Sequence, residues 1–152
     1  MTNKGKIFIG LTFLTLAATV LSAQVRRLKL CCIAGDYKGS QVHSQLPDCP
    51  LPKSENFTMA ISQARGCGTD VWGTITSSSG ELNKFKGTLS RGPKGCCVLN
   101  ASFSSPGHPE HVVTLTGTFC RKLAKWTANG IYTEINSGDP CKQSGTWQLQ
   151  QI

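Results

Sequence analysis

The feature that most constrains the fold is a repeated alternation of apolar and polar residues in short segments separated by Gly, Pro, Ser and Asn. Its period of two residues is that of a β-strand with one buried and one wet face. Beyond residue 30 no useful stretch has the period of an amphipathic helix. The chain is therefore predicted to be all-β. We expect strands at about 35–43, 57–63, 70–76, 83–90, 96–104, 111–119, 125–134 and 144–151.

The alternation also assigns side chains to the two faces of the sheet. Phe57, Met59 and Ile61 share the face that we expect to be buried, whereas threonines and asparagines dominate the opposite face. Trp72 and Ile131 break the rule, because they fall on the wet face.

Sequential antiparallel strands with short links can close on themselves, which removes the unpaired edges of an open sheet. We therefore favour an eight-stranded antiparallel up-and-down barrel over the alternative, a two-sheet β-sandwich. A barrel of about eight strands is just wide enough to be filled by side chains or to hold one small ligand. Inward glycines leave both outcomes open, because a glycine either opens space or admits a neighbouring ring. They are Gly73, Gly87, Gly117, Gly130 and Gly145.

Two short motifs carry a resemblance. Gly35-Asp36-Tyr37-Lys38-Gly39 in the first strand and Gly145-Thr146-Trp147 in the last are similar to the Gly-aromatic strand signatures of avidin- and lipocalin-like (calycin) β-barrels. The resemblance covers only these residues of the 152-residue chain. It implies ligand binding inside the barrel and transfers no binding residue to this sequence.

The cysteines predict a disulfide framework, since the chain holds an even set in a small domain. They are Cys31, Cys32, Cys49, Cys67, Cys96, Cys97, Cys120 and Cys141. Zinc is disfavoured, because thiols at CxxC spacing do not occur.

The topology sorts these cysteines between two ends. We call the end where the first strand begins the base, and the opposite end the mouth. Bridged Cα atoms lie within about 7 Å of each other, so only cysteines at one end can pair. The expected bridges are Cys49–Cys141 at the mouth, and at the base one of Cys31/Cys32 with Cys67, one of Cys96/Cys97 with Cys120, and the two remaining members with each other.

The N-terminus has the layout of a secretory signal, because Lys4 and Lys6 precede an uncharged apolar run that ends at Ala23. We therefore expect a signal peptide over 1–23, a basic N-terminal linker over 24–34 and a single barrel domain over 35–152. The mature protein would be secreted or periplasmic, without a transmembrane span. Retention of residues 1–23 as a membrane anchor is the alternative, because basic residues follow the run at once.

The net charge of the chain is +8, and the charged residues also sort between the base and the mouth of the predicted barrel. The base collects Arg26, Arg27, Lys29, Arg65, Arg91, Lys94, Arg121, Lys122 and Lys125. The mouth collects Asp48, Glu55, Glu81, Glu110, Glu134 and Asp139, with His43, His108 and His111. The basic end could contact an anionic surface, although a solvated charged end explains it as well. Nucleic acid is disfavoured as a partner, because export removes the usual targets.

Catalytic and metal-binding patterns are weak. The sequence has no G-x-S-x-G motif, no free cysteine once all have paired, and no carboxylate pair that we assign to the inward face. The histidines lack HxH or HxxxH spacing, so a surface role is favoured over a metal site. We therefore lean against an enzyme, and expect no cofactor and no metal.

Two functions remain. The first is an exported binding protein that holds a small apolar ligand in the barrel. Its lining would be Tyr37, Phe57, Met59, Phe85, Phe103, Trp126, Tyr132 and Trp147. The second is a protein-interaction module, such as an exported inhibitor or envelope component, that acts through the loops Gln45–Asn56 and Ser104–His111.

The export hypothesis predicts the covalent state of the mature chain. Mass spectrometry of the exported protein should show Gln24 as the first residue and no reactive thiol. A mature form that retains residues 7–23, or that has two or more reactive thiols, would contradict this expectation.

Overall fold

The computed structural model describes residues 31–44, 52–105, 108–135 and 143–152. The chain divides into two compact units, residues 1–30 and 31–152, and every described residue belongs to the second. The predicted signal peptide, residues 24–30 of the predicted linker, and the predicted Cys49–Cys141 bridge lie outside the described residues.

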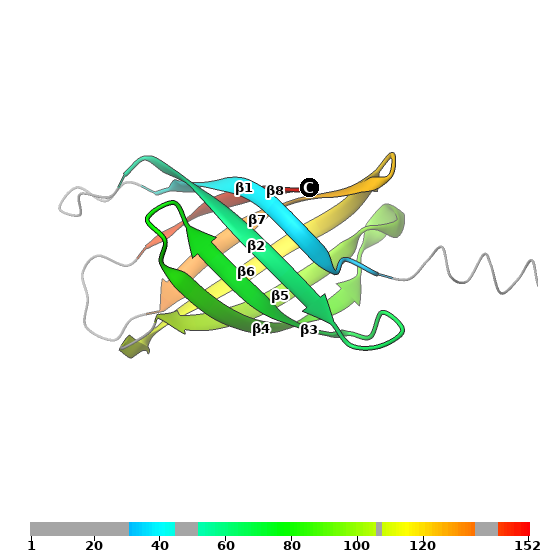
Figure 1. Ribbon diagram of the computed structural model, residues 1–152, viewed down its shortest axis with the longest axis horizontal. Helices are drawn as coiled ribbons and strands as arrows, with labels where there is room; N and C mark the ends of the chain where they lie inside the picture. Colours follow the sequence, from blue (N-terminus) through cyan, green and yellow to red (C-terminus); the bar gives the residue numbers. More distant parts are fainter. Residues whose placement is uncertain (1–30, 45–51, 106–107, 136–142) are drawn as a thin grey trace, which may run out of the picture. The chain divides into compact units, whose positions relative to one another are not determined.

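Within the described residues, eight antiparallel strands form a closed barrel in chain order, as Figure 1 shows. They are β1 (Gly35–His43), β2 (Ser54–Gln63), β3 (Asp70–Ser77), β4 (Leu82–Arg91), β5 (Cys97–Ser105), β6 (His108–Lys122), β7 (Lys125–Ile135) and β8 (Ser144–Gln151). A 3₁₀ turn, η1 (Pro93–Gly95), precedes β5. In this part of the chain, no helix is long and apolar enough to cross a membrane. The all-β up-and-down barrel is confirmed, and the sandwich is not formed.

The faces follow the alternation. In β2, Phe57, Met59 and Ile61 are buried, and the residues between them are exposed. Trp72 and Ile131, which we assigned to the wet face, are 46% and 57% exposed. Pairing of β8 with β1 from Tyr37↔Gln151 to His43↔Gly145 closes the sheet.

Four of the five inward glycines, Gly73, Gly117, Gly130 and Gly145, lie against a neighbouring aromatic ring, whereas Gly87 lies against Ala101 and the backbone of β5. Gly130 pairs with Trp147 on β8 and with Gly117 on β6, and the Trp147 indole lies over both glycines. A Cβ at either position would collide with that ring. At Gly73 a Cβ would stand 2.9 Å from the Phe85 ring. The possibility that these glycines leave open space is therefore excluded at these positions.

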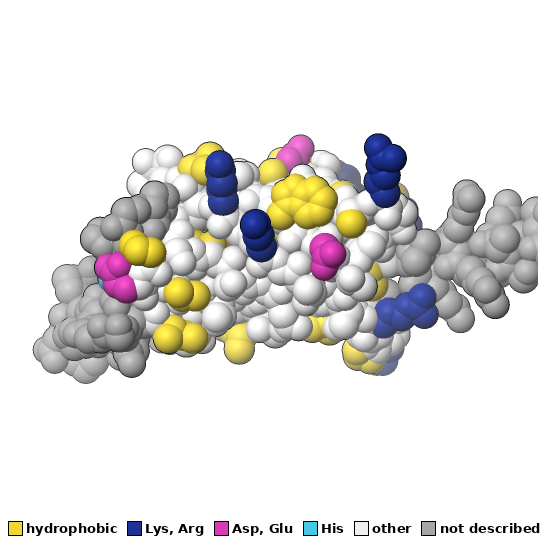
Figure 2. Space-filling model, turned by 90° about the horizontal axis from the view of Figure 1, so that it is seen from below, with side chains coloured by type: hydrophobic (Ala, Val, Ile, Leu, Met, Phe, Trp, Pro, Cys, Tyr) yellow, Lys and Arg dark blue, Asp and Glu magenta, His cyan; other side chains and the backbone are white. Residues whose placement is uncertain are grey.

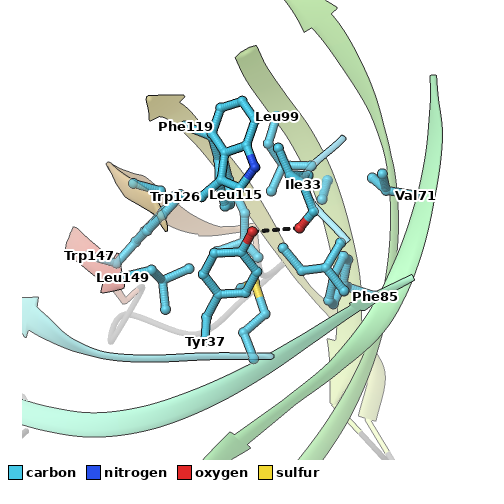
Figure 3. Close-up of a cluster of buried hydrophobic side chains, with 14 of the residues drawn as sticks. Ile33, Tyr37, Val71, Phe85, Leu99, Leu115, Phe119, Trp126, Trp147 and Leu149 are labelled. Atoms are coloured by element: carbon cyan, nitrogen blue, oxygen red, sulfur yellow. Dashed lines mark hydrogen bonds between the residues drawn. The ribbon is translucent and has the colours of Figure 1, made fainter. Parts of the chain in front are cut away.

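The base half of the barrel is filled. Ile33, Tyr37, Phe85 and Phe119 are almost completely buried there (Figure 3). The Tyr37 and Phe119 rings meet edge to face, with centroids 5.6 Å apart, and the Tyr37 hydroxyl donates to the Ile33 carbonyl. Ile33 belongs to the segment that we assigned to the linker, but the barrel unit begins at Cys31. Burial of Ile33 and two disulfides hold this segment against the base.

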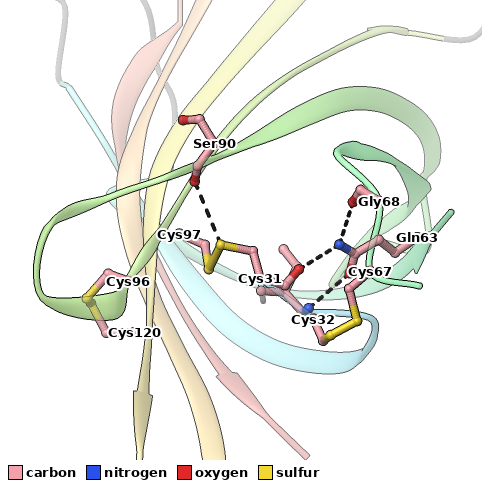
Figure 4. Close-up of a disulfide and its surroundings, with 10 residues drawn as sticks. Cys31, Cys32, Gln63, Cys67, Gly68, Ser90, Cys96, Cys97 and Cys120 are labelled. Carbon is pink, nitrogen blue, oxygen red and sulfur yellow. Dashed lines mark hydrogen bonds between the residues drawn. A yellow bond between two sulfur atoms is a disulfide. The ribbon is translucent and has the colours of Figure 1, made fainter. Parts of the chain in front are cut away.

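Three disulfides join the base of the barrel (Figure 4). They are Cys32–Cys67, Cys96–Cys120 and Cys31–Cys97, with Cα–Cα distances of 4.9, 4.4 and 5.7 Å. The sorting by ends is confirmed for these six cysteines. The two doublet members left over by the other bridges, Cys31 and Cys97, bind each other across the base. Sequence reasoning left open which member of each doublet binds which partner.

Gln63, at the end of β2, holds residues 31–33 against the base by hydrogen bonds. The Gln63 side-chain amide donates to the Cys31 carbonyl at 2.6 Å and to the Gly68 carbonyl at 2.7 Å. Its oxygen accepts from the Ile33 amide at 3.1 Å. The base is therefore closed by covalent bonds, hydrogen bonds and packed rings together.

The close fit of Trp147 against Gly117 yields a stability prediction. Gly117→Ala should lower the free energy of unfolding by roughly 1–3 kcal/mol, because the added methyl group overpacks the contact with the indole. Urea unfolding measures the change. Thr116→Ser, on the exposed side of the same strand, is the control and should change stability by less than about 0.5 kcal/mol. Equal stability of Gly117→Ala and the wild type would show that the ring does not lie there.

Candidate functional site

The mouth half of the barrel contains a cavity of about 300 Å³. This volume lies at the lower end of the range for small-molecule sites. Pro52, Ser79 and Glu81 line the cavity and are exposed, so it reaches the molecular surface. The described residues thus form a barrel whose interior is filled at the base and hollow toward the mouth.

Five of the eight predicted lining residues meet in this cavity. They are Phe57, Met59, Phe103, Tyr132 and Trp147. The other three, Tyr37, Phe85 and Trp126, do not line it and belong to the buried core. Tyr37 and Trp126 lie near the base ends of β1 and β7, and Phe85 packs in the same buried core.

Polar residues form much of the wall, which differs from the apolar lining that we expected. They are Gln41, His43, Glu55, Ser77, Ser79, Glu81, Asn83, His111, Glu134 and Gln143. The conclusion that no carboxylate pair faces inward is therefore wrong. The alternation contained the signal, because Glu55 stands two residues before Phe57 and Glu134 two residues after Tyr132. We had assigned only apolar residues and glycines to the inward face, and had not extended the alternation to the polar residues at the strand ends.

A buried histidine and tyrosine form the centre of the polar wall. The Tyr132 hydroxyl and His43 Nδ1 lie 2.6 Å apart in a hydrogen bond, and His43 is only 6% exposed. On the other side of the imidazole, Nε2 stands 4.0 Å from a carboxylate oxygen of Glu55, beyond hydrogen-bond reach. His43 Nε2 is therefore buried without a hydrogen-bond partner among the described residues.

The environment of Tyr132 keeps its hydroxyl protonated. Burial raises the pKa of Tyr132 to about 12, and the nearby carboxylates of Glu134 and Glu55 act in the same direction. Both effects disfavour the phenolate, which would be a further negative charge. Tyr132 is therefore neutral at physiological pH.

A second polar atom on the wall also has no partner. Asn83 is 9% exposed, and its Nδ2 donates to a Glu81 carboxylate oxygen at 3.2 Å. A carboxylate only accepts, so this bond fixes the orientation of the amide. Asn83 Oδ1 consequently points away from Glu81, and it is buried without a donor in the described part of the chain.

The two deeper carboxylates are held in place. Glu55 accepts from Gln41 Nε2 at 3.2 Å and from the Ser78 hydroxyl at 3.1 Å. A carboxylate oxygen of Glu134 lies 3.1 Å from His111 Nδ1, and the other accepts a hydrogen bond from the backbone N–H of Gln143 at 3.3 Å. Their side chains are 20% and 10% exposed. Both are thus positioned at the wall before any ligand arrives.

The charged residues that we assigned to the two ends lie where predicted, as far as the structure describes them, although Asp36 and Asp70 also lie at the base and Lys53 at the mouth. Basic side chains flank the turns at the base, namely Arg65, Arg91, Lys94, Arg121, Lys122 and Lys125. Glu55, Glu81, Glu110 and Glu134 lie at the mouth. Figure 2 shows Lys and Arg at the right, base end of this face and acidic side chains at its left end, with further side chains of both signs between the two ends. Arg26, Arg27, Lys29, Asp48, Asp139 and the His108 side chain lie outside the described residues.

The described residues contain no group of three or more His, Cys, Asp or Glu side chains that could hold a metal ion. Comparison with protein-family models, with curated proteins and with solved structures found no match. The site is therefore interpreted from its own geometry.

Both tyrosines of the chain are buried, which predicts a shifted alkaline titration. Burial also raises the pKa of Tyr37. Ultraviolet absorbance of the folded protein should show little tyrosinate at about pH 10–11, whereas the urea-unfolded chain should titrate near pH 10. Because only the unfolded state loses these protons, stability should fall as pH rises from about 10 to about 12. A tyrosinate signal near pH 10 from protein that circular dichroism shows to be folded would contradict the burial of one ring.

Proposed function

We propose that this chain is an exported binding protein that holds a small molecule in the mouth cavity. The observation that carries the proposal is a pair of buried polar atoms, His43 Nε2 and Asn83 Oδ1, that line one cavity and have no hydrogen-bond partner among the residues that the structure describes. Buried polar groups in folded proteins are almost always hydrogen-bonded, because desolvation without a partner costs roughly 1–3 kcal/mol. A ligand that hydrogen-bonds to either atom would supply a partner that the described residues do not.

The framework around the cavity suits a binding protein. Three disulfides and the filled base hold the strands that carry the wall, so little ordering is required when a ligand enters. Disulfides are also typical of oxidising compartments, which supports a secreted or periplasmic location. Export itself remains part of the proposal.

The wall combines polar groups with an apolar floor that includes Met59, Ile75 and Leu115. Burying about 200 Å² of apolar ligand surface there would contribute on the order of 5 kcal/mol at about 25 cal/mol per Å², before the costs of association. Apolar contact alone therefore supports only modest affinity. The unpartnered polar atoms supply the remaining affinity and the orientation of the ligand.

A matched pair of cavity variants tests the proposal. Val113 lines the cavity, whereas Val112 precedes it on the opposite face of β6. Val113→Phe should fill part of the space and weaken binding of a small aromatic probe by at least about tenfold, or about 1.4 kcal/mol. Val112→Phe should leave binding unchanged. If Val113→Phe does not fold, Ile75→Phe provides the same test from β3.

Tryptophan fluorescence reports the binding. Trp147 lines the cavity, while Trp72 is exposed on the outer wall and Trp126 does not line the cavity. A Trp72→Phe/Trp126→Phe background isolates the Trp147 signal. Neutral, cationic and anionic phenyl compounds are titrated in turn. Absence of saturable change with any of them, or an equal response in the two valine variants, would refute a binding site in the barrel.

A further inference from the structure

The cavity wall is acidic, whereas the protein as a whole is basic. The chain has 16 Lys and Arg against 8 Asp and Glu, yet the described residues that line the cavity include Glu55, Glu81 and Glu134 and neither a lysine nor an arginine. Carboxylates in a concave, partly desolvated site produce a stronger potential than carboxylates on an open surface. The cavity therefore attracts cations and repels anions.

The hydrogen-bonding capacity of the wall points in the same direction. Asn83 Oδ1 is a buried acceptor with no donor in the described part of the chain, and the bond from Nδ2 to Glu81 prevents the amide from reversing. The carboxylates of Glu55 and Glu134 are acceptors as well. The indole N–H of Trp147 is a donor, but it is already bonded to the Ile131 carbonyl at 3.0 Å. Asn83 Oδ1 therefore requires a hydrogen-bond donor.

Aromatic side chains provide the second part of the recognition. Phe57, Phe103, Tyr132 and Trp147 line the cavity together with the aliphatic floor. Aromatic faces attract ammonium groups and pack well against apolar bodies. The wall is thus acidic toward its rim and apolar toward its floor, which matches a molecule with one charged end and one apolar end.

From these observations, and on the premise of the proposed binding function, we infer that the ligand is a small organic amine with an apolar or aromatic body. Its ammonium group donates to Asn83 Oδ1 and is neutralised by the wall carboxylates, while its body occupies the floor. A metal ion is a poor alternative, because the described residues supply no cluster of three metal-ligating side chains.

Three probes of nearly equal shape test the charge preference. 2-Phenylethylamine is cationic, 2-phenylethanol is neutral and phenylacetate is anionic at neutral pH. The wild-type protein should bind the amine at least about tenfold more tightly than the alcohol, and phenylacetate more weakly than either. Equal or tighter binding of the alcohol or of phenylacetate would overturn the inference and leave the proposed binding site standing.

Charge-neutralising variants locate the preference. Glu134→Gln and Glu55→Gln keep the shape of the side chain and should weaken amine binding several-fold, up to about tenfold, with the alcohol affected much less. Asp70→Asn changes the net charge equally at the base end of β3 and should leave both affinities unchanged. If Glu134→Gln, Glu55→Gln and Asp70→Asn have the same effect on the amine, or if the glutamates affect the amine and the alcohol alike, the inference fails. The comparison of the three probes in the wild type needs no variant. If none of the three binds, both the inference and the proposed function fail.

Discussion

Pairing of β8 with β1 is the constraint on which the rest of the structure depends. Closure turns the inward face of the sheet into a small enclosed volume, so every inward side chain competes for the same space. The Trp147 indole fits within that volume because Gly130 on the adjacent β7 and Gly117 on β6 have no side chain. The position of each glycine is thus explained by the ring that lies over it.

The two ends of the barrel interior differ in their side chains and in their packing. At the base, Ile33 and Tyr37 fill the interior and the Cys31–Cys97 bridge crosses it. At the mouth, the inward positions carry polar side chains that cannot pack as a dry core, because each needs hydrogen-bond partners. His43 and Asn83 are buried there all the same. The proposed ligand would supply the hydrogen-bond partners that His43 Nε2 and Asn83 Oδ1 lack among the described residues.

Much of the fold was predictable from local pattern. A period of two residues identifies strands, and short links between antiparallel strands leave few topologies. The symmetry of the predicted 96–104/111–119 hairpin about residue 108 indicated that Cys96 or Cys97 would bind Cys120. It could not choose between the two, since neighbouring residues on a strand differ in the direction of their side chains and the geometry of the base decides which one reaches.

The sequence by itself determined the strands, the two faces, the polarity of charge along the barrel and which cysteines share an end. All of these follow from the order of residues along one strand or from the alternation of strand direction. Only the tertiary structure decided that Tyr37 and Trp126 lie in the packed core while Tyr132 and Trp147 line a cavity. The depth of an inward residue depends on strand stagger and on what the opposite wall contributes, and these relations arise only when the sheet closes.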